Sequence, residues 1–205
     1  DFETANVARC WMRNLTYGRV SRAERAAYRN LVNSVEPPQT AMEMNPFREQ
    51  IGGMSRGCAW GWALPGRPER AAELAWRDAR LSHERNGLYA AMWAAAATSA
   101  AFAAPSAARA LEVGLSEVPR KCRLADVIGR IREARKEGRS AGDTLENLMK
   151  EYRSYSAMHV LTNAAIVALG LLWGEDDFSR TVGLTVQAGQ DTTGNGSVAG
   201  AVCGA

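Results

Sequence analysis

The last stretch of the chain, Ala188 to Ala205, reads AGQDTTGNGSVAGAVCGA and gives the first indication of the fold. Asp191 stands just before a run of small residues, which is typical of a helix that packs closely against neighbouring helices. At such a helix start, a carboxylate can accept hydrogen bonds from free N–H groups or hold a metal through its oxygens. The residues alone favour the first interpretation, a capped helix, and leave the metal site as the alternative.

The composition of the whole chain also favours helices. The 205 residues are 46% apolar, which suits one compact domain with a sizeable core. Alanine is abundant and β-branched residues are comparatively few, so we predict an all-α fold of roughly eight to ten helices. Two apolar runs, Gly87 to Ala104 and Met158 to Trp173, are too weakly apolar or too short to span a membrane. We expect both runs to be buried helices, and we expect no membrane partner.

Capping patterns and breakers set the expected boundaries of the helices. Ser21 and Glu24 form a capping-box pattern, Ser106 and Asp143 stand at further expected helix starts, and Gly138 is expected to be a C-cap. Thr4 is the expected N-cap of the first helix. Helices are predicted over 1–14, 21–33, 68–81, 88–103, 106–116, 124–137, 143–155, 157–173, 178–188 and after residue 191.

The region from Glu43 to Gly66 is predicted to be irregular, because glycine and proline recur throughout it. One interpretation is a surface loop that Trp60 and Trp62 anchor. The other is a ligand-binding loop, since glycines let the backbone approach a ligand closely and their N–H groups can bind phosphate.

Charge and cysteine usage exclude several kinds of function. The net charge is only +3 and basic residues alternate with acidic ones, so we expect no nucleic-acid partner. The cysteines lie far apart and the chain has only two histidines, so no zinc pattern fits. We expect reduced, mostly buried thiols in a cytoplasmic protein. The cysteines are Cys10, Cys58, Cys122 and Cys203, and the histidines are His83 and His159.

Several segments resemble the ADP-ribosylglycohydrolase family. The stretch Asp191 to Gly196, with the closing Gly204-Ala205, resembles the family's C-terminal motif, G-x-D-T-D-[TSC] followed by small residues and G-A. Further segments resemble one bacterial branch and occur in the same order along nearly the whole chain. They are Asn45–Gly52 with Arg56, Glu73–His83, Asn86–Tyr89, His159–Ala165 and Leu172–Phe178. On these motifs the chain is identified as a member of the family.

The resemblance implies a compact all-α fold with a cleft for ADP-ribose and a centre of two metal ions, normally Mg²⁺ or Mn²⁺. The implied reaction is hydrolysis of the glycosidic bond between ADP-ribose and a protein side chain or a related group. The resemblance assigns Asp191 to catalysis and metal binding, and Thr193 to a metal-ligand position. It implies that the Gly52–Arg56 loop binds the diphosphate or the adjacent ribose. The implied ligand-binding residues are Gly52, Arg56, His83, Asn86, Gly87 and Asn195.

The sequence departs from the family pattern at the metal motif. Thr193 stands where the second metal-binding aspartate belongs, Gly194 where the hydroxyl belongs, and Ala91 where the branch often has glutamate. No T-D-D-T-like motif of the kind that supplies further ligands was found. We therefore expect the 1–205 domain to be truncated, incomplete at its N-terminus and at its C-terminus. Because one carboxylate cannot offset the dehydration of two dications, we predict weak or absent metal binding and low activity.

Three functions remain open from the sequence. The first is a metal-dependent ADP-ribosyl hydrolase whose remaining ligands lie outside the given sequence. The second is a pseudoenzyme that binds ADP-ribose or a nucleotide, and its binding would be insensitive to a chelator. The third is a truncated, inactive relative, which would unfold with poor cooperativity because its core would be exposed. The acceptor residue and the oligomeric state are not indicated by the sequence.

Overall fold

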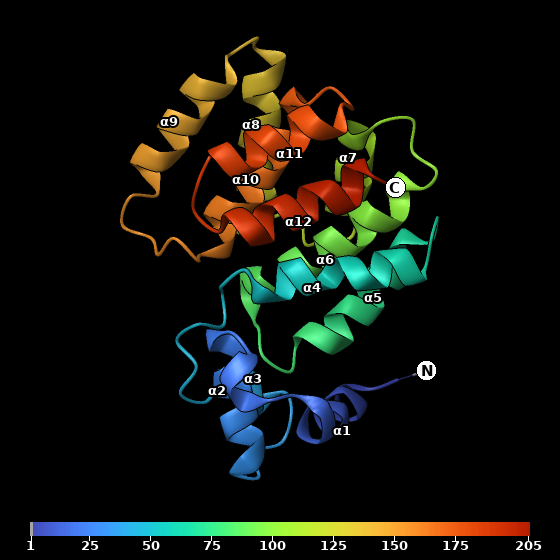
Figure 1. Cartoon of the computed structure of the whole chain (residues 1–205), viewed down its shortest axis with the longest axis vertical. Coiled ribbons are helices and arrows are strands. Elements are labelled where there is room, and N and C mark those ends of the chain that lie inside the picture. The colour runs from blue at the N-terminus through green and yellow to red at the C-terminus, as the bar shows by residue number, and fades with distance from the viewer. Residues whose placement is uncertain (1) are drawn as a thin grey trace.

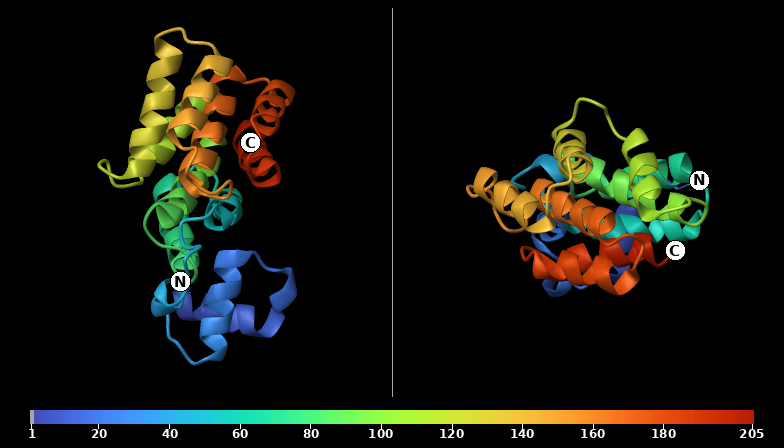
Figure 2. Two further views of the ribbon diagram at one scale, coloured as in Figure 1. Left: turned by 90° about the vertical axis from the view of Figure 1, so that its left-hand side faces the viewer. Right: turned by 90° about the horizontal axis from the view of Figure 1, so that it is seen from above.

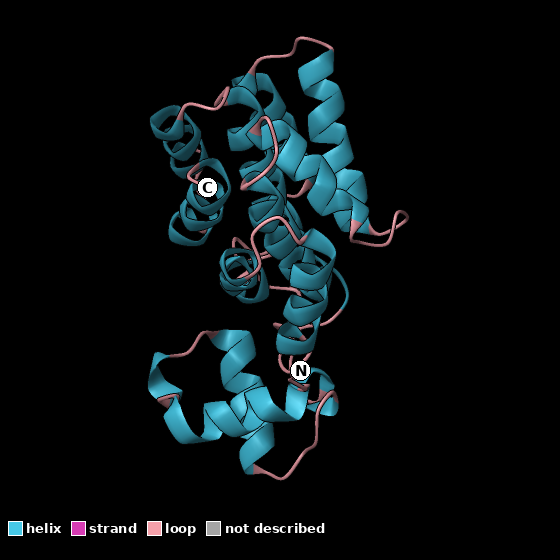
Figure 3. Cartoon of the chain, turned by 90° about the vertical axis from the view of Figure 1, so that its right-hand side faces the viewer, coloured by secondary structure: helices cyan, strands magenta, loops and turns pink. Residues whose placement is uncertain are grey.

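The computed structural model describes residues 2–205, and the described chain is helical, as predicted (Figures 1 and 3). It forms α1 (Thr4–Asn14), η1 (Tyr17–Arg19), α2 (Arg22–Val32), α3 (Gln39–Met42), α4 (Gly52–Ala63), α5 (Pro68–Ala79), α6 (Arg85–Ala101), α7 (Ala107–Ser116), α8 (Arg123–Lys136), α9 (Ala141–Glu151), α10 (Val160–Trp173), α11 (Phe178–Gln187) and α12 (Thr192–Cys203). These twelve α-helices, counted over residues 2–205, exceed the predicted eight to ten. The short helices η1 and α3 were not predicted.

The helices are arranged along one long axis, with the N-terminal helices at one end (Figures 1 and 2). Helices α1 to α3 form an N-terminal unit, residues 2–44, which shares a small apolar cluster with the segment after α5. Helices α4 to α6 lie in the middle, and α7 to α12 form the larger end. The small cluster contains Ala8, Trp11, Ala27 and Leu81, so α1 and α2 are fixed to the segment that follows α5.

The main core is organised around α10, which is buried on all sides except at Leu172. It contacts α8, α11 and α12 among others, and its Ile166 and Leu169 are buried in the main hydrophobic cluster. Helix α6 is also largely buried, so both apolar runs are the buried helices that were predicted. Within residues 2–205, no helix has both the length and the apolar character that crossing a membrane requires.

The prediction of an irregular region from Glu43 to Gly66 was wrong over its second half, where α4 runs from Gly52 to Ala63. Three of its glycines, Gly53, Gly57 and Gly61, recur every four residues and face α6. A Cβ atom on Gly57 would lie 2.5 Å from the carbonyl oxygen of Ala91, and one on Gly61 would lie 2.7 Å from that of Ala95. The glycines therefore allow two helix backbones to pack closely, and they are not a sign of loop structure here.

Several capping predictions were confirmed and others need correction. Ser106 accepts a hydrogen bond at the start of α7, and Gly138 has the positive φ of +74° expected after α8. The N-cap of α1 is Glu3 and not Thr4, which is the first residue of the helix. Helix α9 begins two residues before Asp143, because the Ser140 side chain caps its N-terminus. It ends at Glu151.

Candidate functional site

A pocket of about 380 Å³ lies between α2, α4 and α12, with many polar residues in its lining but mostly apolar atoms at its accessible surface. It brings together four residues that the sequence analysis assigned to the site: Gly52, Arg56, Asp191 and Thr193. These residues come from the N-terminal halves of α4 and α12, so two helix starts meet at the pocket. The complete lining is Ser21, Glu24, Gln50, Ile51, Gly52, Ser55, Arg56, Met158, Asp191, Thr193, Gly194 and Ser197.

Asp191 is the N-cap of α12, as predicted. Its Oδ1 accepts a hydrogen bond of 3.0 Å from the backbone N–H of Gly194, and the residue is partly exposed. A Cβ atom on Gly194 would lie 2.8 Å from Asp191 Oδ2 and 2.9 Å from Ser55 Oγ. Glycine at this position therefore leaves room for the Asp191 carboxylate between the starts of α12 and α4.

The backbone of Asp191 is held by Asn163 of α10. Asn163 Oδ1 accepts from the Asp191 N–H at 3.1 Å and from Asn195 Nδ2 at 2.8 Å. Asn163 Nδ2 donates to the carbonyl oxygens of Ala157 and His159, both at 2.8 Å. Asn163 is completely buried, and its hydrogen bonds fix the start of α12 against the segment that carries Met158 into the pocket.

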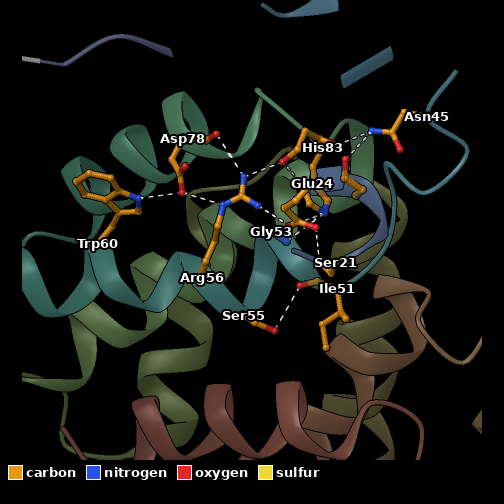
Figure 4. Close-up of polar contacts among 12 residues, drawn as sticks. Ser21, Glu24, Asn45, Ile51, Gly53, Ser55, Arg56, Trp60, Asp78 and His83 are labelled. Carbon is orange, nitrogen blue, oxygen red and sulfur yellow. Dashed lines mark hydrogen bonds and ion pairs between the residues drawn. The ribbon is translucent and has the colours of Figure 1, made fainter. Parts of the chain in front are cut away.

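Arg56 is the centre of a partly buried ion network (Figure 4). Its Nη1 donates to Glu24 Oε1 at 2.7 Å, its Nε to Asp78 Oδ2 at 3.0 Å and its Nη2 to Ser82 Oγ at 2.9 Å. The guanidinium also lies 5.3 Å from the ring centroid of Trp11. One guanidinium thus faces two carboxylates, and its orientation is fixed by α2, α5 and the segment after α5.

Glu24 is a pocket residue that the sequence analysis did not assign to the site. Its spacing from Ser21 is that of a capping box, but the two side chains bond to each other and Ser21 makes no side-chain bond to the backbone of α2. Gly52 must lack a side chain, because a Cβ atom there would collide with the Glu24 carboxylate. No local pattern could have shown that Glu24 reaches Arg56 of another helix.

Glu24 is ionised at neutral pH. Burial raises the pKa of its carboxyl, but positive charge on His83 and Arg56 and the Ser21 hydrogen bond outweigh burial and hold that pKa below its usual value. Burial lowers the pKa of His83 to about 4, so the imidazole is neutral at neutral pH. Arg56 is therefore the cation that keeps Glu24 ionised under those conditions.

His83 lies behind the pocket wall and does not line the pocket. Its Nε2 accepts a hydrogen bond of 3.1 Å from the backbone N–H of Gly53, and its Nδ1 lies 2.9 Å from Ser82 Oγ. Because Nε2 accepts, the proton of the neutral ring is assigned to Nδ1, which donates to Ser82. In the structure His83 fixes the start of α4, and its predicted ligand-binding role stays a prediction.

Asn86, Gly87 and Asn195 also lie outside the pocket lining. Asn86 Nδ2 donates to Glu49 Oε2 at 2.8 Å, and its Oδ1 accepts from the Leu124 N–H at 3.1 Å. A Cβ atom on Gly87 would collide with the backbone near residue 48. Asn195 is fully buried against Asn163, and its Oδ1 has no hydrogen-bond partner among residues 2–205. Ligand-binding roles for these three residues stay predictions.

The pocket residues do not fit a centre of two metal ions. Two dications need several converging anionic oxygens. Asp191 and Glu24 are the carboxylates of the lining, and Glu24 is already paired with Arg56. Thr193 is exposed and offers a neutral hydroxyl. Across residues 2–205, no group of three histidine, cysteine or acidic residues is placed to hold a metal ion.

The chain forms an all-α domain whose pocket lies at the starts of two helices. The ADP-ribosylglycohydrolase family model matches residues 1–205, and the chain belongs to that family. The family acts on ADP-ribosylated substrates and is generally metal-dependent. No curated protein and no solved structure matched the chain in the other two comparisons.

Proposed function

We propose that the pocket between α2, α4 and α12 binds the ADP-ribosyl group of a modified substrate, and that hydrolysis of the glycosidic bond is impaired in this chain. The observation that carries the proposal is the meeting of Gly52, Arg56, Asp191 and Thr193 at one pocket in a member of the family. These residues come from two separate family-like segments of the sequence, 45–56 and 191–205.

The chemistry of the pocket suits a ligand that combines a diphosphate with sugar hydroxyls. The first turns of α4 and α12 lie at the pocket, and helix N-termini favour anionic groups. The N–H groups of Gly53 and Gly194 already donate to His83 and Asp191, so a ligand would use the remaining N–H groups of these turns. Asp191, Thr193 and Ser55 supply carboxylate and hydroxyl oxygens that can bond to ribose hydroxyls. Arg56 offsets part of the negative charge of Glu24, and the same guanidinium also pairs with Asp78.

The same residues support impaired hydrolysis. Cleavage of a glycosidic bond by protein groups alone normally uses one carboxylic acid as a proton donor and a second carboxylate as a base or nucleophile. Glu24 cannot be the proton donor at neutral pH, because its pKa lies below the usual value and Arg56 holds it ionised. Asp191 then has no acidic partner in the pocket lining.

Binding of free ADP-ribose, measured by isothermal titration in the presence of a chelator, tests the proposed site. We expect saturable binding to the wild type and its loss in Ser197→Trp, because a large side chain on this exposed pocket residue fills the space. The matched control, Ser154→Trp, changes an exposed serine outside the pocket and should bind as the wild type does. Equal binding by Ser197→Trp and the wild type would contradict the site.

Turnover of ADP-ribosylarginine separates the remaining alternatives. The proposal expects ADP-ribose binding with slow or undetectable turnover that added Mg²⁺ or Mn²⁺ does not increase. Metal-dependent turnover by the purified chain would favour a competent hydrolase. Absence of ADP-ribose binding together with a broad, poorly cooperative melting transition would favour an inactive relative.

A further inference from the structure

We propose that one face of α2 is a docking surface for protein substrates whose modified residue is surrounded by acidic side chains. This arginine face consists of Arg22, Arg25 and Arg29 together with the exposed Tyr17 and Met44. The inference rests on the proposed function, because it assigns a substrate class to the pocket that α2 helps to form.

The three arginines lie on one side of their helix. Their spacing of three and four residues places them within an arc of about 60° around the α2 axis. Each contacts a neighbouring segment: Arg22 lies 5.7 Å from the Phe47 ring centroid and Arg25 5.7 Å from that of Tyr17. Arg29 Nη2 donates to the Met44 carbonyl at 3.0 Å. The contacts place Tyr17 beside Arg25 and the Met44 backbone beside Arg29, and Arg22 lies against the Phe47 ring.

The charges on this face lack counterions among residues 2–205. Arg22, Arg25 and Arg29 are exposed, and across residues 2–205 none of them forms an ion pair with a carboxylate. Other arginines, such as Arg67 and Arg120, also form no ion pair within residues 2–205, but Arg22, Arg25 and Arg29 are distinguished by lying together on one side of one helix. The N-terminal unit has four acidic residues within 2–44, and two of them, Glu3 and Glu24, are already paired outside the unit. A partner with negative charge would therefore meet uncompensated cations on this side of α2.

The apolar residues on the face favour a protein partner over a nucleic acid. Met44 is 81% exposed and Tyr17 is 47% exposed, and both lie directly against the arginines. The unit contains six arginines and no lysine in residues 2–44. Arginine, tyrosine and methionine are enriched at protein interfaces, whereas lysine is depleted. A phosphate backbone would use the arginines and would leave Met44 without a partner.

The arginine face begins beside the pocket. Ser21, which lines the pocket, directly precedes α2 and lies next to Arg25 around the helix axis. Glu24 follows on the pocket side of the same turn. Glu24 points about 100–160° away from the three arginines around the α2 axis, so residues that neighbour a modified residue in the pocket reach the arginine face around the edge of the helix at Ser21 and Arg25.

The test uses two peptides that carry ADP-ribose through a stable oxime bond, one flanked by glutamates and one by glutamines. We expect the wild type to bind the acidic peptide about tenfold more tightly than the glutamine peptide in roughly 50 mM salt. This preference should disappear in about 0.5 M salt. It should also disappear in the variant Arg22→Gln/Arg25→Gln/Arg29→Gln, whose affinity for free ADP-ribose should equal that of the wild type.

Two further variants test whether the preference for the acidic peptide depends on the positions and on the charge of the three α2 arginines. Substitution of three exposed arginines on other surfaces, Arg67→Gln/Arg120→Gln/Arg153→Gln, should leave the preference unchanged. Replacement of the three α2 arginines by lysine should keep most of it, because the charge is retained. Thermal melting of each variant checks that the fold is intact.

Several results would overturn the docking surface. The first is that the wild type binds the two peptides with equal affinity. The second is that the control variant Arg67→Gln/Arg120→Gln/Arg153→Gln loses the preference as the α2 variant does. The third is that the wild type binds a single-stranded oligonucleotide more tightly than the acidic peptide. Failure of free ADP-ribose to bind would instead count against the pocket. In that case the unmodified acidic and glutamine peptides still test the arginine face, and equal affinity of the wild type for them would contradict it.

Discussion

Arg56 Nη1 lies 2.7 Å from Glu24 Oε1 on the wall of the pocket, and this ion pair determines what the pocket can do. Glu24 would otherwise be a second carboxylate beside Asp191, available to a metal ion or as an acid. Because Arg56 holds it, the pocket presents one carboxylate to a ligand together with hydroxyls and helix N-termini. The proposed impairment of hydrolysis follows from this pairing.

Removal of the Arg56 guanidinium should destabilise the fold. Arg56→Met leaves Glu24 and Asp78 as poorly exposed carboxylates without their cation, and we expect a loss of about 3 kcal/mol in the free energy of unfolding. Urea denaturation measures this loss. Adding Glu24→Gln and Asp78→Asn to the variant should restore part of the stability, because the unpaired charges are then removed. A loss below about 1 kcal/mol would show that the network contributes little.

His83 should make stability depend on pH in a defined window. Its pKa is lowered to about 4 in the folded chain, whereas an unfolded histidine titrates near its ordinary value of 6.5. Between these values the unfolded state binds more protons, so the stabilisation is present above about pH 6.5 and is lost as the pH falls toward 4. The loss should approach about 3 kcal/mol. Glu24 contributes a further loss below its unfolded pKa of about 4.5, because its folded pKa is lowered.

Denaturation of the wild type and of His83→Gln at about pH 7 and pH 5 measures the histidine contribution. The glutamine can still accept the hydrogen bond from Gly53, so the variant should fold and should lose less stability between these two pH values. The same change in stability in both proteins would rule out His83 as the titrating group.

Close packing of α4 on α6 can be tested at a single glycine. Gly57→Ala places a Cβ atom 2.5 Å from the Ala91 carbonyl oxygen, and we expect a loss of about 2 kcal/mol as the helices separate. The matched control is Gly129→Ala in α8, where a Cβ atom has no neighbour within 4 Å. The control should gain about 0.5–1 kcal/mol, since alanine favours helix. Stabilisation by both substitutions would contradict the packing.

Asn163 is expected to position Asp191 for ligand binding. Asn163→Ala leaves the Asp191 N–H and the carbonyl oxygens of Ala157 and His159 without their buried partner, so we expect a loss of about 1–3 kcal/mol. The variant should also bind ADP-ribose more weakly in the chelator titration. Gly183→Ala, where the added atom meets nothing within 4 Å, serves as the control that keeps affinity. Unchanged affinity in Asn163→Ala would limit Asn163 to a structural role.

Much of the fold could be read from local sequence signals. The long apolar run of α10 identified a central helix, and the carboxylate before the small residues of α12 identified its N-cap. The start of α4 could not be read in this way. Glycines at every fourth position are compatible with a loop or with close helix packing, and the alanines of α6 that decide between them lie about 34 residues later.

The site was predictable only in part for a similar reason. Family-like motifs located Asp191, Thr193, Gly52 and Arg56, and these residues do line one pocket. The sequence did not indicate Glu24 as a site residue, because a capping box already accounts for its spacing from Ser21. Its actual partner, Arg56, is 32 residues away in the sequence.

Titration of the purified chain with Mn²⁺, followed by ADP-ribose titrations with and without a chelator, tests the central claim most directly. We expect no tight Mn²⁺ binding, and an ADP-ribose dissociation constant that the chelator changes by less than about twofold. Binding of about two Mn²⁺ ions per chain with micromolar affinity, together with loss of ADP-ribose binding in the chelator, would contradict a pocket that works through a single free carboxylate.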